Sequence, residues 1–204
     1  MLVEMQCYAV RLFLSFTVHV LCLPSDGVNS QCRSVYGKGV SIADILIILN
    51  GHNNFRNDIA QGKYVTKGLP EGKDFKEMVW DTGLAQAAQR VADSCLFQHQ
   101  QIKDDRWKSV GQNLHIYMST ANTQGADWKG VLNAWIGEYK AYRFGQKITK
   151  QNGHLTQMMW SDTKFVGCGF TSFLSNDPKF KYKKLYVCNY GPGGNIVNRL
   201  PYRT

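Results

Sequence analysis

The sequence predicts a single α/β domain in which helices flank a small sheet. Three segments have the apolar periodicity of helices, and two later segments have the composition of strands on either side of a turn. The chain has 204 residues, of which 44% are hydrophobic and 19% are charged. That length suits one compact domain, and that composition is too polar for a membrane channel. We find no internal repeat, low-complexity linker or second domain boundary.

The N-terminal segment differs from the rest and has the pattern of a secretory signal peptide. Arg11 precedes an apolar stretch at residues 12–23 that is too short to span a bilayer comfortably, and cleavage after Ser30 fits the small polar segment there. A buried or interfacial anchor helix is the alternative. We expect a signal peptide at residues 1–30, a mature domain at residues 31–204 with no transmembrane segment, and a secreted, extracellular protein.

The first helix is expected to begin at Ser41 and to end before Gly62. Asp44 stands at the third helical position, which completes a capping box with Ser41. Apolar residues then recur with a helical period that includes His52 and Phe55. Because His52 lies on this apolar side, we interpret it as a structural histidine of the core.

Two more helices and a strand are expected in the middle of the chain. Residues 82–95 place small and apolar side chains on one helical face, residues 113–118 alternate like a strand, and residues 127–144 form a third helix. In the third helix Glu138 follows Trp135 by three residues, so it lies on or beside the buried stripe. That is an unusual place for a carboxylate.

The cysteines predict two disulfides. Cys7 and Cys22 lie in the predicted signal peptide, so the mature chain keeps an even number: Cys32, Cys95, Cys168 and Cys188. An even count in an exported chain favours disulfides, and four cysteines allow three pairings. Free thiols or a metal cluster are the alternatives, but the spacings fit no zinc signature.

One of the three pairings follows from strand register. Residues 164–173 and 183–190 are strand-like, and the turn between them is centred on residue 178. A hairpin folded at that turn places Cys168 opposite Cys188, within disulfide reach. Cys32 with Cys95 then follows by elimination.

The charge balance favours anionic partners. Lys and Arg number 24 against 15 Asp and Glu, which gives a net charge of +9. Four lysines near the hairpin turn could form a basic patch for an anionic lipid, a sulphated glycan or a cell-surface protein: Lys179, Lys181, Lys183 and Lys184. The alternative is a solvated hairpin edge that lysines protect from aggregation. Nucleic acid is not expected, because an exported chain without a reader motif has no evident means of binding it.

Four segments, in order, resemble the motifs of one family. Residues 52–56 (HNNFR) resemble its HNxxR motif, and residues 111–114 (GQNL) resemble G[EQ]N[LIV]. Residues 153–160 (GHLTQMMW) and 185–196 (LYVCNYGPGGNI) resemble its two signatures, with Leu155 where the family usually has an aromatic residue. The chain thus resembles the CAP superfamily (cysteine-rich secretory proteins, antigen 5 and pathogenesis-related 1), and within it the antigen 5 or venom allergen 5 proteins of arthropods.

The resemblance implies a three-layer α/β/α sandwich with a cleft where two histidines and two acids meet. Carried over to this sequence, the cleft residues are His99, Gln112, Glu138 and His154. Gln112 departs from the family pattern because an amide replaces a carboxylate, which removes one negative charge and one general base. His99 and His154 would suit weakly bound Zn²⁺ or Cu²⁺, completed by Glu138 or water. The alternative is that each histidine only forms hydrogen bonds with its neighbours.

Two classes of function remain. The resemblance favours a secreted, non-enzymatic protein of saliva, venom or haemolymph that binds a small apolar ligand or a host or prey surface protein. The alternative is a metal-assisted, protease-like hydrolase that uses His99, His154 and Glu138. A hydrolase needs a base and oxyanion donors, whereas here one carboxylate is missing and no Ser or Cys has an evident base partner. We favour binding and assign no catalytic residue.

Overall fold

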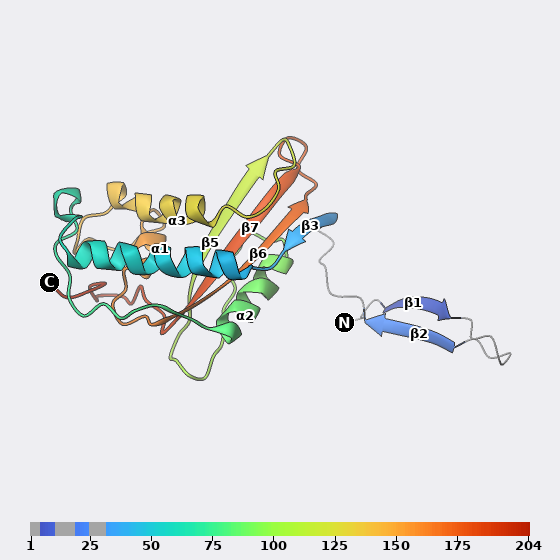
Figure 1. The fold of residues 1–204 in the computed structure, drawn as a ribbon, viewed down its shortest axis with the longest axis horizontal. Helices are drawn as coiled ribbons and strands as arrows, with labels where there is room; N and C mark the ends of the chain where they lie inside the picture. The colour runs from blue at the N-terminus through green and yellow to red at the C-terminus, as the bar shows by residue number, and fades with distance from the viewer. Residues whose placement is uncertain (1–4, 11–18, 25–31) are drawn as a thin grey trace.

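The computed structural model describes residues 5–10, 19–24 and 32–204 (Figure 1). Strands β1 (Met5–Val10) and β2 (His19–Pro24) form a two-stranded antiparallel sheet. The expected cleavage position after Ser30 lies outside the described residues. Within the described ranges, every helix is too short or too polar to cross a membrane.

The centre of the domain is a five-stranded sheet. Its antiparallel path runs β3–β6–β7–β5, and the short strand β4 pairs in parallel with β6. The strands are β3 (Ser34–Lys38), β4 (Val79–Trp80), β5 (Gly111–Ser119), β6 (Phe165–Leu174) and β7 (Tyr182–Gly191). The predicted hairpin is therefore confirmed as β6–β7, and the predicted strand at residues 113–118 lies within β5.

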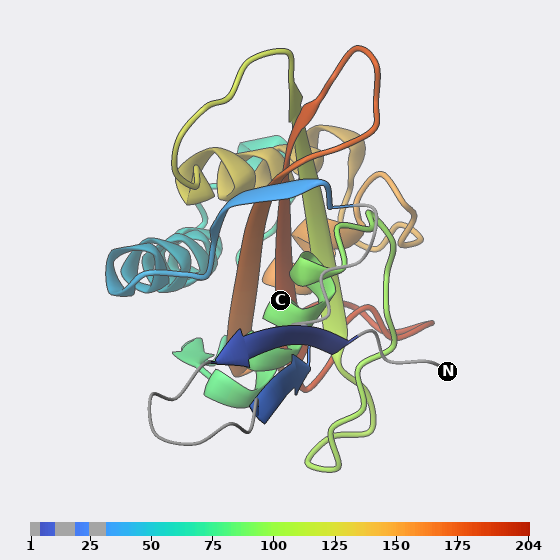
Figure 2. The same ribbon diagram turned by 90° about the vertical axis from the view of Figure 1, so that its right-hand side faces the viewer.

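Helices cover both faces of this sheet, as Figure 2 shows, so the predicted three-layer α/β/α sandwich is confirmed. Helix α2 (Thr82–Asp93) packs on one face, against side chains such as Leu185 and Val187 of β7. The neighbouring Tyr186 and Cys188 point to the other face, because side chains alternate along a strand. That face carries α1 (Ile42–Ala60), α3 (Trp128–Ile136) and α4 (Gly153–Met158). Two short 3₁₀ helices, η1 (Val65–Lys67) and η2 (Gly137–Ala141), complete the fold.

Two glycines of β6 let α2 approach the sheet closely. A Cβ atom at Gly167 would overlap the backbone of Ala85, and one at Gly169 would overlap the backbone of Gln89. Both glycines point toward α2, between residues whose side chains fill the opposite core. Only glycine leaves room for a helix backbone at this distance.

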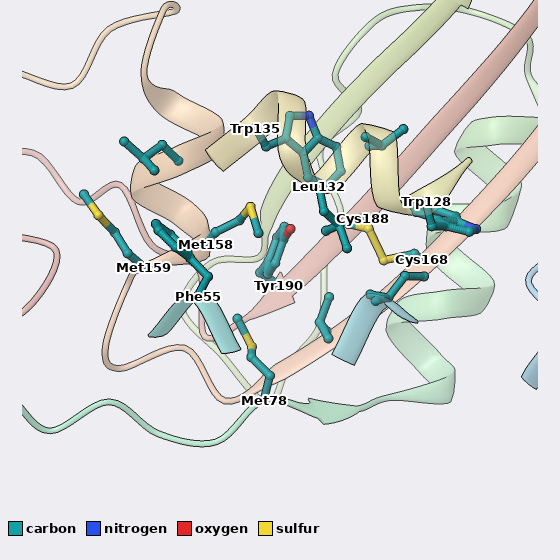
Figure 3. Close-up of a cluster of buried hydrophobic side chains, with 14 of the residues drawn as sticks. Phe55, Met78, Trp128, Leu132, Trp135, Met158, Met159, Cys168, Cys188 and Tyr190 are labelled. Atoms are coloured by element: carbon teal, nitrogen blue, oxygen red, sulfur yellow. A yellow bond between two sulfur atoms is a disulfide. The ribbon is translucent and has the colours of Figure 1, made fainter. Parts of the chain in front are cut away.

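Both expected disulfides are formed. Cys168 and Cys188 are directly opposed in the β6–β7 register and are bonded to each other, and Cys32 is bonded to Cys95. Figure 3 shows the Cys168–Cys188 bridge inside the larger core cluster, close to Trp128 and Leu132 of α3. The bridge thus lies beneath the helices on this face of the sheet.

Helix α1 has the predicted capping box, whereas the third helix is shorter than predicted. Ser41 accepts a hydrogen bond from the Asp44 backbone N–H, and the Asp44 carboxylate accepts one from the Ser41 N–H. The helix predicted at residues 127–144 is a correction: α3 ends at Ile136 and continues only as the 3₁₀ helix η2. The tighter turn carries Glu138, whose carboxylate accepts a hydrogen bond from the first turn of α4.

Candidate functional site

An open hollow of about 930 Å³ lies where β5, the first turn of α4 and residues 97–99 meet. His99, Gln112 and His154 all line it, so the structure brings these three sequence-predicted residues to one cleft. Glu138 lies behind His154 and contacts it directly. The four residues therefore form two hydrogen-bonded pairs, one for each histidine.

His154 is held by the carboxylate of Glu138 and by an aromatic ring. Its Nδ1 lies 2.6 Å from Glu138 Oε1, while Glu138 Oε2 accepts the Leu155 backbone N–H at 2.9 Å. The imidazole stacks on Trp135, with ring centres 5.7 Å apart and planes 18° apart. Asn113 Nδ2 also donates to the His154 carbonyl, at 3.1 Å. Backbone and ring of His154 are both fixed.

The partner of His154 determines which of its nitrogens can bind a cation. A carboxylate only accepts hydrogen bonds, so Nδ1 of His154 carries a proton and donates a hydrogen bond to Glu138. The neutral ring then has its free lone pair on Nε2. A carboxylate behind a histidine in this way orients and strengthens it as a metal ligand.

A second pair fixes His99 with the same result. The backbone N–H of Gln100 donates to Gln112 Oε1 at 3.1 Å, which identifies that atom as the amide oxygen. His99 Nδ1 lies 3.0 Å from the same oxygen and must therefore donate to it. Nε2 of neutral His99 then has the free lone pair. Gln112 gives His99 the acceptor that a carboxylate would give, without its charge.

Gln112 is in turn held by residues that the sequence analysis did not place at the site. Its Nε2 donates to Asn189 Oδ1 at 3.0 Å, and Asn189 Nδ2 donates to the Leu84 carbonyl at 3.2 Å. The stacking partner Trp135 was missed as well. Asn189 follows Cys188 in the second signature, and this adjacency was the only signal in the sequence.

The cleft offers a cation two donor atoms, Nε2 of His99 and Nε2 of His154. Among the described residues, no group of three or more His, Cys, Asp or Glu side chains is arranged to hold a metal ion. A cation bound by both imidazoles would take its other ligands from water, because each oxygen of Glu138 already accepts a hydrogen bond. A structural zinc site would be closed by four protein ligands, so this arrangement suits reversible binding.

His52 is a core histidine, as expected. It is fully buried, its Nδ1 donates to the Ile48 carbonyl at 2.8 Å, and its Nε2 lies 3.0 Å from the Tyr190 hydroxyl. Burial lowers the pKa of His52 to about 4. Its neighbour Arg56 donates to four backbone carbonyls, with no carboxylate partner among the described residues. The HNxxR segment therefore builds the core.

The four lysines predicted as a basic patch do not share one exposed surface. Lys179 and Lys181 are exposed beside the hairpin turn. Lys183 forms an ion pair with Asp177 at 3.3 Å, and Lys184 is buried, with 8% of its surface exposed. The physical reason is strand alternation, because Lys183 and Lys184 are neighbours in β7 and point to opposite faces.

Comparisons with known proteins agree on one family. Residues 49–190 match the sequence pattern of the cysteine-rich secretory protein (CAP) family. The chain is 35% identical to venom allergen 5 of Vespa magnifica over 193 residues, and the match covers 91% of this chain and 84% of the relative. It is 38% identical to a CRISP/Allergen/PR-1 protein of Trittame loki over 90% of this chain, but spans only 46% of that protein.

Solved structures show the same fold. The structure described as NaASP2 with Zn²⁺ matches with a TM-score of 0.65 and 26% identity, over 81% of this chain and 88% of that one. The venom allergen-like protein 4 of Schistosoma mansoni matches with a TM-score of 0.60 and 28% identity, over 78% and 93%. The fold and the sequence motifs thus agree.

Proposed function

The chain belongs to the cysteine-rich secretory protein (CAP) family and is venom allergen 5-like, and from this premise we propose that it is an extracellular, non-enzymatic binding protein whose cleft takes a divalent cation. Zn²⁺ or Cu²⁺ would bind to Nε2 of His99 and of His154. The observation that carries this proposal is the pair of fixed Nδ1–H donors, on His99 to Gln112 and on His154 to Glu138, at one hollow.

Several observations support the cation and the extracellular setting. Imidazole nitrogens suit Zn²⁺ and Cu²⁺, and a relative of the same fold is described with Zn²⁺. Two disulfides are typical of exported proteins, and several relatives are named as venom allergens. The proposed signal peptide at residues 1–30 would direct the chain to the same compartment.

The proposal of a binding rather than a hydrolytic role follows from the acid–base groups. A metal-assisted hydrolase needs a base that can take a proton from water. Glu138 accepts hydrogen bonds on both oxygens, from His154 and Leu155, and Gln112 cannot act as a base. Turnover of peptide or ester substrates by protein free of host proteases, lost in Glu138→Gln, would contradict this part of the proposal.

Metal binding is tested by thermal unfolding. Zn²⁺ at about one hundred times its dissociation constant stabilises the folded state by about 2.7 kcal/mol, which raises Tm by roughly 5–10 °C for a domain of this size. We expect this shift relative to a chelator, and its loss in the double variant His99→Ala with His154→Ala. His115→Ala, a histidine outside the cleft lining, should keep it. Equal melting curves with and without Zn²⁺ would overturn the proposal.

A second candidate ligand is a small apolar molecule. A hollow of about 640 Å³ adjoins the cleft and shares Ile148 and Asn195 with it. Its lining includes Val197, which is 82% exposed, and Leu200, which is 54% exposed. Large apolar side chains left exposed together favour ligand binding. Native mass spectrometry of the secreted protein should show bound lipid that Val197→Asp with Leu200→Asp reduces, and ligand-free protein in both forms would contradict this.

A further inference from the structure

The loop at residues 195–200 exposes three large apolar side chains close together. Ile196 is 38% exposed, Val197 is 82% exposed and Leu200 is 54% exposed. All three line the hollow of about 640 Å³ that adjoins the histidine cleft, and we call them the apolar tip. Contact between water and this much apolar surface is unfavourable, so the tip favours a partner that covers it.

A tight turn presents the apolar tip. The Arg199 backbone N–H donates to the Ile196 carbonyl at 3.1 Å, and Asn198 within the turn has a φ of 62°, a left-handed conformation that asparagine tolerates. Asn195, just before the turn, forms side-chain hydrogen bonds of 2.7 and 2.8 Å with α4. The base of the loop is therefore anchored, and Val197 lies at the corner of the turn.

The surroundings of the tip are basic and contain few acids. Residues 139–161 include no Asp or Glu and four cationic residues, all exposed: Lys140, Arg143, Lys147 and Lys150. None of the four has an ion-pair partner among the described residues. Lys147 lines the same hollow as the tip, Lys150 lines the adjoining cleft, and neither lining includes a carboxylate. Asp162, just after this segment, is paired with Arg199 at 2.9 Å.

We propose that this face docks on an anionic lipid membrane, with the apolar tip inserted at the interface and Lys147 and Lys150 beside the lipid head groups. Peripheral proteins bind membranes by burial of apolar side chains together with attraction of basic residues to anionic lipids. The combination favours a membrane over a sulphated glycan, because a glycan would pair with the lysines but would offer the tip no apolar phase.

This docking goes beyond the proposed function. It uses neither of the two cleft histidines and no bound cation. It also differs from the uptake of one small apolar molecule, because it depends on a surface of anionic head groups. The three ideas can therefore fail separately.

The test is co-sedimentation of the protein, purified from a secreting host, with lipid vesicles in the presence of a chelator. Vesicles of phosphatidylcholine with phosphatidylserine should bind it at least tenfold more tightly than vesicles of phosphatidylcholine alone, and high salt should remove most of this preference. Val197→Asp with Leu200→Asp should weaken binding at least tenfold. Lys147→Gln with Lys150→Gln should do the same, since each lysine contributes to the attraction.

Matched controls restrict the effect to this face. Ile42→Asp removes an apolar side chain of similar exposure, 80%, at the start of α1. Lys179→Gln with Lys181→Gln removes two exposed lysines beside the hairpin turn. Both controls should bind vesicles like the unchanged protein, and so should His99→Ala with His154→Ala. Every variant changes exposed or partly exposed side chains, so circular dichroism should show folded protein throughout.

Three results would overturn the proposal. The first is equal binding to the two kinds of vesicle. The second is unchanged binding in the tip variant, which together with a loss in the Lys147 and Lys150 variant would indicate a site for an anionic polymer instead. The third is a lipid retained in native mass spectrometry by a protein that does not sediment with vesicles, which would favour the small apolar ligand alone.

Discussion

A chain of buried hydrogen bonds connects the HNxxR segment to the cleft. The Ile48 carbonyl accepts a hydrogen bond from Nδ1–H of His52, so Nε2 of His52 accepts one from the Tyr190 hydroxyl. Asn113 Nδ2 then lies 3.3 Å from the Tyr190 hydroxyl and 3.1 Å from the His154 carbonyl. The backbone of His154 is thus connected, through Asn113 of the cleft lining, to Tyr190 and His52, which do not line the cleft.

Removing one hydroxyl from this chain should be costly. Tyr190→Phe leaves Nε2 of His52 and one N–H of Asn113 without partners in the core, and each buried unsatisfied group costs about 1–3 kcal/mol. We expect urea unfolding to show a loss of about 2 kcal/mol or more. Tyr36→Phe, at a tyrosine that is 44% exposed, should change stability by less than about 0.5 kcal/mol. Equal stability of the two variants would show that these buried hydrogen bonds contribute nothing to the free energy of unfolding.

The buried His52 also predicts a pH dependence of stability. Its pKa is about 4 in the folded state, against about 6.5 for an ordinary histidine. The unfolded chain therefore binds more protons between these values, and stability falls as the pH falls from 6.5 toward 4. Between pH 7 and pH 5 this residue alone should remove about 2 kcal/mol.

Urea unfolding at pH 7, 6 and 5 measures this loss. His52→Gln should flatten the profile, whereas His99→Gln, at an exposed histidine, should reproduce it. His115 contributes with the same sign, because burial lowers its pKa too. A profile that is flat between pH 7 and 5 in the unchanged protein would contradict the prediction.

At the scale of elements, the sequence predicted those features that depend on residues close to one another in the chain. The capping box of Ser41 and Asp44 defines the start of α1, and the opposed cysteines define the register of β6 and β7. The end of α3 at Ile136 could not be predicted in this way. There the change to a 3₁₀ turn serves Glu138, whose partners lie in α4, and α4 itself is too short to show a period.

The contact between α2 and β6 gives a prediction about packing. Gly169→Ala would drive a methyl group into the backbone of Gln89, and overpacking of this kind costs about 3 kcal/mol. Gly137→Ala is the matched control, because its Cβ would meet nothing within 4 Å and its φ of −57° suits any residue. Thermal unfolding followed by circular dichroism should show a large fall in Tm for the first variant only. A fall of similar size in both would contradict the close contact.

At the scale of the whole molecule, one disulfide links the start of the domain to the segment that follows α2. The Cys32–Cys95 bridge spans 63 residues. A cross-link that closes a loop of this length lowers the entropy of the unfolded chain, which stabilises the folded state by about 4 kcal/mol. Replacing both cysteines by serine should lower the free energy of unfolding in urea by roughly that amount, with the sheet and the cleft intact. A loss under about 1 kcal/mol would show that the unfolded chain gains little freedom there.

The cleft is a property of the whole fold, which is why residue patterns alone predicted it incompletely. His99 and His154 are far apart in the sequence, and family motifs, rather than spacing, placed them together. Partners that reach the cleft through packing gave no such signal, as Trp135 and Asn189 show. The predicted basic patch is incomplete for the opposite reason. Lys179 and Lys181 are exposed, but Lys183 and Lys184 are adjacent residues of β7 and point to opposite faces.

The anchoring of the two imidazoles has a mechanical consequence. One ring is tethered through Gln112 and Asn189 to α2, beneath the sheet, and the other through Glu138 to the helices above it. A cation shared by both rings would cross-link the two outer layers at this edge. Its departure would loosen that end of the sandwich while the core stays closed, so that cation concentration would set how readily the edge opens.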